Sequence, residues 1–89
     1  MKILKFGAIW CPGCLVMRPL WKKIEEEYIW LETEYFDFDK DKEAVSKYQI
    51  DTKLPVFIFL GRDGGELYRI QGERSKKEIM QLINQYREQ

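Results

Sequence analysis

Residues 3–21 of the chain read ILKFGAIWCPGCLVMRPLW. The segment 3–9 is a short, nearly continuous apolar run, which predicts a buried strand at the centre of a sheet. From Cys14 onward, apolar residues recur at helical spacing with charged residues between them, which predicts a helix. This helix contains Pro19, and we expect a kink there rather than an end, because the apolar period resumes beyond the proline. Cys11 and Cys14 therefore lie where a strand ends and a helix begins.

The rest of the chain continues the alternation of strands and helices. The expected elements are a strand over 33–38, a short helix over 42–48, a strand over 56–60, a strand over 66–70 and a helix that follows Ser75. The run 56–60 is typical of a strand covered on both faces, and the turn residues 61–65 predict a hairpin. Ser75 and Glu78 have the spacing of a capping box. The order β-α-β-α-β-β-α predicts an α/β fold with a four-stranded mixed sheet, parallel in its first half, and with helices on both faces.

Length and composition limit the function classes. The chain has 89 residues, of which 45% are hydrophobic, so we expect one core and a single domain over 1–89. Fifteen basic residues balance fifteen acidic ones, which gives no indication of a nucleic-acid or anionic-membrane partner. No apolar run approaches the roughly 20 residues of a membrane span, and the charged start leads into the first strand without the core of a signal peptide. We therefore expect a cytoplasmic monomer whose partners are proteins or small molecules.

The pair Cys11 and Cys14 is the strongest candidate for chemistry. Free N–H groups and the helix dipole at a helix N-terminus stabilise an anion, which favours the thiolate of Cys11 and makes it the expected nucleophile. Cys14 lies one turn farther along. It is expected to be the more enclosed cysteine and to resolve the mixed disulfide that Cys11 forms with a substrate. Pro12 restricts and Gly13 permits the backbone geometry that brings the two sulfurs together.

Two other interpretations of the cysteine pair stay open. One is half of a zinc site, but such a site needs four nitrogen or sulfur ligands, and the chain has no histidine and no third cysteine. Zinc would therefore require a dimer. The other is an inert buried pair, although a position at a helix start speaks against it. The prediction is that the protein has no metal site and no cofactor beyond the redox-active disulfide of Cys11 and Cys14.

Four landmarks together resemble the thioredoxin family. The motif WCxxC at 10–14 is followed by Pro19 five residues after the second cysteine, Pro55 opens the strand 56–60, and Gly72 follows the hairpin. The chain resembles a short member of that family, with a WCPGC motif and without the extra N-terminal strand and helix, so a minimal thioredoxin fold is implied. The resemblance also implies a protein-disulfide reductase of electron transport and cell redox homeostasis. Such an enzyme reduces disulfide-containing proteins through a mixed disulfide and is recharged by a thioredoxin reductase or another electron donor.

The resemblance extends to substrate binding. It implies a cis Leu54–Pro55 peptide bond beside the dithiol, whereas the sequence alone is equally consistent with Pro55 starting an edge strand. The backbone of Leu54 would pair with an extended substrate peptide. The Trp10 indole would flank the reactive sulfur, unless it is only a packing cap. The expected substrate-binding residues are Trp10, Pro12, Gly13, Leu54 and Pro55.

Two departures from the family pattern leave alternatives open. Lys5 stands where thioredoxins carry a buried aspartate that accepts the proton of the resolving thiol; it either tunes the ionisation of the dithiol or extends to solvent at a sheet end. The Pro12-Gly13 spacer and the short length are partly shared with glutaredoxins, so a glutathione-dependent reductase is the first alternative function. Turn geometry alone explains the Gly64-Gly65-Glu66 pattern that could suggest a glutathione site. A non-catalytic thioredoxin-fold binding module that docks through Pro55 is the second alternative.

Two groups of residues are assigned to structure alone. The run 25–27, three glutamates, is expected on a solvated helix face. Trp21 and Trp30 are expected to pack in the core or at a helix end. No ligand platform is predicted at either tryptophan.

Overall fold

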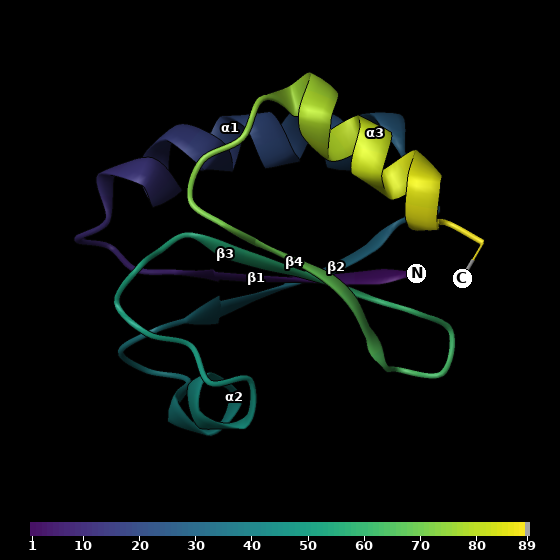
Figure 1. Ribbon diagram of the computed structural model, residues 1–89. Helices are drawn as coiled ribbons and strands as arrows, with labels where there is room; N and C mark the ends of the chain where they lie inside the picture. Colours follow the sequence, from purple (N-terminus) through teal and green to yellow (C-terminus); the bar gives the residue numbers. More distant parts are fainter. Residues whose placement is uncertain (89) are drawn as a thin grey trace.

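The computed structural model describes residues 1–88 as one four-stranded sheet with helices on both faces (Figure 1). The elements, in chain order, are β1 (Lys2–Gly7), α1 (Pro12–Glu27), β2 (Glu32–Asp37), α2 (Lys42–Lys47), β3 (Val56–Leu60), β4 (Glu66–Gln71) and α3 (Lys76–Tyr86). The predicted order of strands and helices is confirmed. Residue 89, the last of the expected domain, lies outside the described residues.

The sheet brings three separate loops to one edge. Its strand order is β2-β1-β3-β4, with β1 parallel to β2 and antiparallel to β3, and with β3 and β4 forming the expected hairpin. At the end of β1, Gly7 pairs with Asp37 of β2, and Phe6 pairs with Val56 of β3. β1 and β2 therefore end where β3 begins. The loops after β1 and β2 and the loop before β3 meet at this edge, called the Gly7 edge below.

The two faces of the sheet have separate cores. α1 and α3 cover one face and α2 covers the other (Figure 1). Side chains along β1 alternate between the faces, as strand geometry requires: Ile3 lies in the cluster under α1 and α3, and Leu4 and Phe6 lie in the cluster on the α2 side. β3 is buried along its whole length, because it has a helical layer on each face.

The junction between β1 and α1 differs from the expected boundaries. β1 ends at Gly7 rather than at residue 9, because the N–H of Cys11 donates to the carbonyl of Ala8 at 3.2 Å and closes a turn. α1 begins at Pro12 rather than at Cys14, since a proline fits the first helical position, where its missing N–H has no helical partner to lose. The whole cysteine motif thus belongs to the first turn of the helix.

The remaining helix signals agree with the structure. Pro19 lies inside α1, which continues to Glu27. Ser75 caps α3 by accepting the N–H of Glu78 at 3.1 Å, so the predicted capping box is confirmed on this side. α2 ends at Lys47, one residue earlier than expected.

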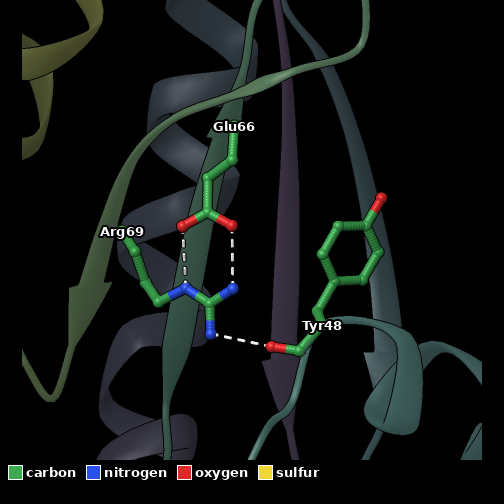
Figure 2. Close-up of polar contacts among 3 residues, drawn as sticks. All are labelled: Tyr48, Glu66 and Arg69. Carbon is green, nitrogen blue, oxygen red and sulfur yellow. Dashed lines mark hydrogen bonds and ion pairs between the residues drawn. The ribbon is translucent and has the colours of Figure 1, made fainter.

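An arginine on β4 fixes the segment that follows α2. Figure 2 shows Arg69 held by both carboxylate oxygens of Glu66, at 3.0 and 2.8 Å, while its third nitrogen donates to the carbonyl of Tyr48 at 2.8 Å. Tyr48 is the C-cap of α2, and the chain turns at Gln49 through a positive φ of 54°. Arg69 therefore ties the start of the loop 48–55 to the sheet, and this loop delivers Pro55 to the Gly7 edge.

Candidate functional site

The first turn of α1 positions both cysteines at the Gly7 edge. Cys11 is the N-cap residue with extended φ and ψ of −95° and 111°, and its sulfur accepts the backbone N–H of Cys14 at 3.2 Å. Both cysteines are free thiols. The predicted placement of the pair at a junction of strand and helix is therefore correct.

The thiol of Cys14 has a raised pKa. Burial first, and then a hydrogen bond from its thiol to Cys11, raise the pKa of Cys14 to about 12. The Cys11 sulfur thus faces two donors, the N–H and the S–H of Cys14. Donors aimed at one sulfur stabilise its anion. The two cysteines therefore differ in their surroundings, and it is the pKa of Cys14 that is raised.

The expectation that Cys14 is the more enclosed cysteine is wrong. Cys11 is 5% exposed, whereas Cys14 is of intermediate exposure. The reason is that Cys11 caps its own helix: its side chain turns back over the first turn of α1 toward the N–H of Cys14. Although Cys11 has less exposed surface, burial is still the first cause of the raised pKa of Cys14, and the hydrogen bond to Cys11 is the second.

Pro55 lies against the cysteine turn. The Leu54–Pro55 bond is cis, as the resemblance implied. A Cβ atom placed on Gly13 would lie 3.2 Å from Cδ of Pro55, so only a glycine lets the two loops approach this closely without displacement. The Pro55 carbonyl accepts the N–H of Gly72 at 2.7 Å, and Gly72 has a φ of 94°. Gly13 of the cysteine motif, Pro55 and Gly72, far apart in sequence, are therefore neighbours.

Only part of the Leu54 backbone is free for a substrate. Its N–H donates to the carbonyl of Thr52 at 3.0 Å, within a turn in which Asp51 also binds the N–H of Lys53 at 2.9 Å. The expectation that the whole Leu54 backbone is available is thus wrong for the N–H.

Trp10 is held beside the site by a residue that sequence analysis missed. Its indole N–H donates to Oδ2 of Asp39 at 2.8 Å, and its ring meets Phe38 edge-on with centroids 6.0 Å apart. The indole is still 49% exposed. Asp39 comes soon after β2, and β2 pairs in parallel with β1. Parallel pairing brings the segments after the two strands together, and this was the signal that could have placed Asp39 near Trp10.

Lys5 is paired in the interior and does not extend to solvent at a sheet end. Its ammonium lies 2.6 Å from Oε2 of Glu25 and 5.7 Å from the centre of the Trp21 ring, and its side chain is 17% exposed. Thr33 donates to the same Glu25 oxygen at 3.1 Å. The prediction that residues 25–27 all lie on a solvated face is therefore wrong for Glu25, because a lysine under α1 needs a counter-ion. Trp21 is buried as predicted.

Trp30 packs at the end of α1. Its ring stacks on Tyr28 with centroids 5.3 Å apart, and the guanidinium of Arg87 lies 4.6 Å from its centre. This agrees with the prediction of helix-end packing.

A cavity of about 190 Å³ lies behind Cys14. Its walls include Lys5, Glu25 and Tyr35, so charged and phenolic groups line the same cavity as Cys14. Tyr35 faces this cavity because its register partner on β1 is Lys5. Burial, followed by the charges of Asp37 and Cys14, raises the pKa of Tyr35. The sequence predicts Tyr35 only as one residue of the strand over 33–38.

Other candidate ligand sites gain no support from the geometry. Gly64 and Gly65 lie in the turn between β3 and β4, at the end of β3 opposite to Pro55, so they are not part of the site. Within residues 1–88, no group of three or more His, Cys, Asp or Glu side chains is placed to hold a metal ion. No helix in the same residues is long and apolar enough to span a bilayer.

Comparisons with known proteins all point in one direction. The family model Thioredoxin matches residues 1–85. Thioredoxin H7 of Arabidopsis thaliana is 31% identical over 85 residues, which are 96% of this chain and 64% of that protein. Thioredoxin-related transmembrane protein 1 of Bos taurus is 34% identical over 83 residues, which are 92% of this chain and 29% of that protein. The chain spans less than two thirds of the length of either relative. The X-ray structure of Fasciola hepatica thioredoxin superposes with a TM-score of 0.86 at 28% identity, over 96% of this chain and 79% of that one.

Proposed function

This chain belongs to the thioredoxin family, and from that premise we propose that it is a thiol–disulfide oxidoreductase that reduces protein disulfides through Cys11 and Cys14. One observation carries the assignment of roles. The Cys11 sulfur accepts the N–H of Cys14 at 3.2 Å and also its S–H, so a negative charge is favoured on Cys11 while Cys14 keeps the proton.

The reaction divides into two exchanges. In the first, the Cys11 thiolate attacks one sulfur of a substrate disulfide; a bond forms from Cys11 to that sulfur, and the other substrate sulfur leaves as a thiolate that takes a proton from solvent. In the second, Cys14 loses its proton and attacks Cys11, and the remaining substrate thiolate leaves. The substrate gains two electrons and the cysteine pair loses two. A reductase or another electron donor then returns two electrons to the Cys11–Cys14 disulfide, the only redox group that the proposal requires.

The surface around Cys11 suits a peptide substrate. Ile9, Trp10 and Leu15 are 77%, 49% and 50% exposed, and Pro12 is exposed beside them. An apolar patch of this kind favours contact with another protein chain. We assign Trp10, Pro12, Gly13, Leu54 and Pro55 to substrate contact, with the carbonyl of Leu54 as the backbone group that a peptide would pair with. As a reductant the protein would act in a reducing compartment such as the cytoplasm, and we propose that it does so as a monomer.

Insulin reduction tests the proposal. With dithiothreitol as electron source, the protein should accelerate insulin precipitation, and Cys11→Ser should abolish the acceleration. Cys14→Ser should instead accumulate a mixed disulfide with the substrate, visible by mass spectrometry of the unreduced sample. If wild type gives no acceleration, or Cys11→Ser retains it, the proposal is wrong.

The source of electrons is a separate question with its own assay. A coupled assay with NADPH and a flavin-dependent thioredoxin reductase should sustain turnover. The same assay with glutathione and glutathione reductase should not, because the Gly64–Gly65 turn lies away from the cysteines. Faster turnover with glutathione would favour the glutaredoxin-like alternative.

We include Lys5 in the proposal as a residue that tunes the ionisation of Cys14. It lines the same cavity as Cys14, and it brings a cation and its partner Glu25 into that space. Lys5→Met should shift the pKa of Cys14, measured by the pH dependence of alkylation. Lys2→Met is the matched control. Lys2 lies on β1 like Lys5, but it pairs with Glu34 of β2 and does not line the cavity. An unchanged pKa of Cys14 in Lys5→Met would remove Lys5 from the mechanism.

A further inference from the structure

The second exchange requires a path for the proton of Cys14. A thiol with a pKa of about 12 is almost fully protonated at neutral pH, so the proton must leave as the sulfur attacks Cys11. The group that receives this proton has to lie close to the Cys14 sulfur and to exchange protons with solvent.

The surroundings of Gly7 show which group lies close to the Cys14 sulfur. A Cβ atom placed on Gly7 would be 3.1 Å from the sulfur of Cys14 and 3.1 Å from the hydroxyl oxygen of Tyr35. The two atoms are therefore separated by no more than twice that distance, and both lie against the buried backbone of Gly7. Glycine is needed at residue 7 for space, because any side chain would push the sulfur or the phenol away.

We propose that the Tyr35 hydroxyl relays the proton of Cys14 to solvent during the second exchange, an inference that rests on the proposed function. A phenol can accept one hydrogen bond and donate another at the same oxygen. The S–H proton passes to the phenol oxygen, directly or through one water, while the phenol proton passes to water. Tyr35 ends as it began, the S–S bond between Cys14 and Cys11 forms, and the substrate leaves as a thiolate that takes up a proton. Tyr35 is 48% exposed, so part of the residue is in contact with water.

The raised pKa of Tyr35 is consistent with a relay and not with a stored base. Burial is its first cause and the charges of Asp37 and Cys14 follow, while Arg18 acts in the opposite direction. The phenol therefore keeps its proton at neutral pH. It can transfer a proton only by giving one up as it takes one in.

Glu25 is the competing acceptor, and its distance from the sulfur weakens it. Glu25 lies eleven positions after Cys14 on α1, a backbone rise of about 16 Å along a helix. Lys5 and Thr33 both bind its Oε2.

The charged and titratable groups that face Cys14 and Tyr35 come from three elements. They are Cys11, Arg18, Lys22 and Glu25 from α1, Lys5 from β1, and Asp37 from β2.

The experiment separates the two exchanges in one trace. Ellman's reagent releases one coloured thiolate when Cys11 attacks it and a second when Cys14 resolves the mixed disulfide, so stopped-flow absorbance gives both rates. Tyr35→Phe keeps the ring and removes the hydroxyl. We expect an unchanged first phase and a second phase slowed by about tenfold or more at neutral pH. Above neutral pH the difference should shrink as hydroxide takes over.

Two more variants define the outcome. Tyr68→Phe, on the outer strand β4 with a similar exposure of 42%, is the matched control and should leave both phases unchanged. Gly7→Ala should slow the second phase as Tyr35→Phe does, because its methyl would displace the same two atoms. A second phase in Tyr35→Phe within twofold of wild type would overturn the relay. A missing first phase in wild type would instead mean that the proposed function is wrong.

Discussion

The ion pair between Lys5 and Glu25 allows a stability prediction with a built-in control. Glu25→Ala leaves the Lys5 ammonium, on a side chain only 17% exposed, without its carboxylate partner. Unpairing a buried charge costs about 3–5 kcal/mol, whereas an exposed pair is worth about 0–1 kcal/mol. Because the Glu25 side chain is 34% exposed, we expect an intermediate loss of about 2 kcal/mol in the free energy of unfolding. In a domain of this size that corresponds to a fall of roughly 8–16 °C in Tm.

Urea unfolding followed by tryptophan fluorescence measures this loss. The matched control is Glu27→Ala, on the same helix, where the carboxylate pairs with Lys76 across a more exposed contact, with side chains 48% and 35% exposed. Both variants replace a glutamate of α1 by alanine, so the difference between them reports the contacts of the two side chains, which for Glu25 are the ion pair with Lys5 and the hydrogen bond from Thr33. We expect Glu27→Ala to lose less than about 1 kcal/mol. Equal losses in the two variants would refute the interior role of Glu25. A double replacement, Lys5→Met with Glu25→Leu, should recover most of the stability, since an apolar pair removes both charges.

Three further predictions follow from single observations. Arg69 lowers the pKa of Glu66 in the folded protein, so the pair stabilises the fold above the ordinary carboxyl pKa of 4.5, and this contribution is lost as the pH falls through the lowered folded value. Arg69→Met should therefore lose less stability than wild type between pH 7 and about pH 3 in urea titrations. Equal losses in the two proteins would contradict this prediction. Gly72 has a φ of 94°, so Gly72→Ala should cost about 1–2 kcal/mol in thermal unfolding, and an unchanged Tm would argue against strain there. Because the pKa of Cys14 is raised to about 12, iodoacetamide near pH 8 should label Cys11 alone on peptide mapping, and equal labelling of both cysteines would contradict the assigned roles.

The fold was predictable because its signals are local and agree with one another. The apolar run 56–60 identifies a strand with a layer on each face, and β3 is buried throughout. Ser75 and Glu78 mark the start of α3 through a cap that depends on three-residue spacing alone. The boundaries of β1 and α1 were less accurate, because the turn closed between Ala8 and Cys11 competes with a strand that the apolar pattern would continue.

The site was predictable only where its residues carry their own signal. Cys11, Cys14 and Pro55 were found from spacing and residue type. Glu25 was not, because its helix neighbours are charged and its partner Lys5 comes from a strand 20 residues away in sequence. Asp39 has the same difficulty, since its hydrogen bond to Trp10 exists only once β1 and β2 lie in parallel register. The predicted parallel pairing brings the ends of the two strands together, but only the register identifies which side chains meet.

The groups near Cys14 also decide how the second exchange responds to acid. The Lys5 cation and the Glu25 carboxylate neutralise each other 2.6 Å apart, so the cavity carries little net charge from this pair. A carboxylate that accepts the Cys14 proton must be ionised, so such an acceptor would make the second exchange slower in acid. A phenol whose pKa is raised stays protonated throughout that range, so a relay through Tyr35 adds no acid limb to the profile. The shape of the second phase between about pH 4 and pH 7 therefore distinguishes the two acceptors even before a residue is replaced.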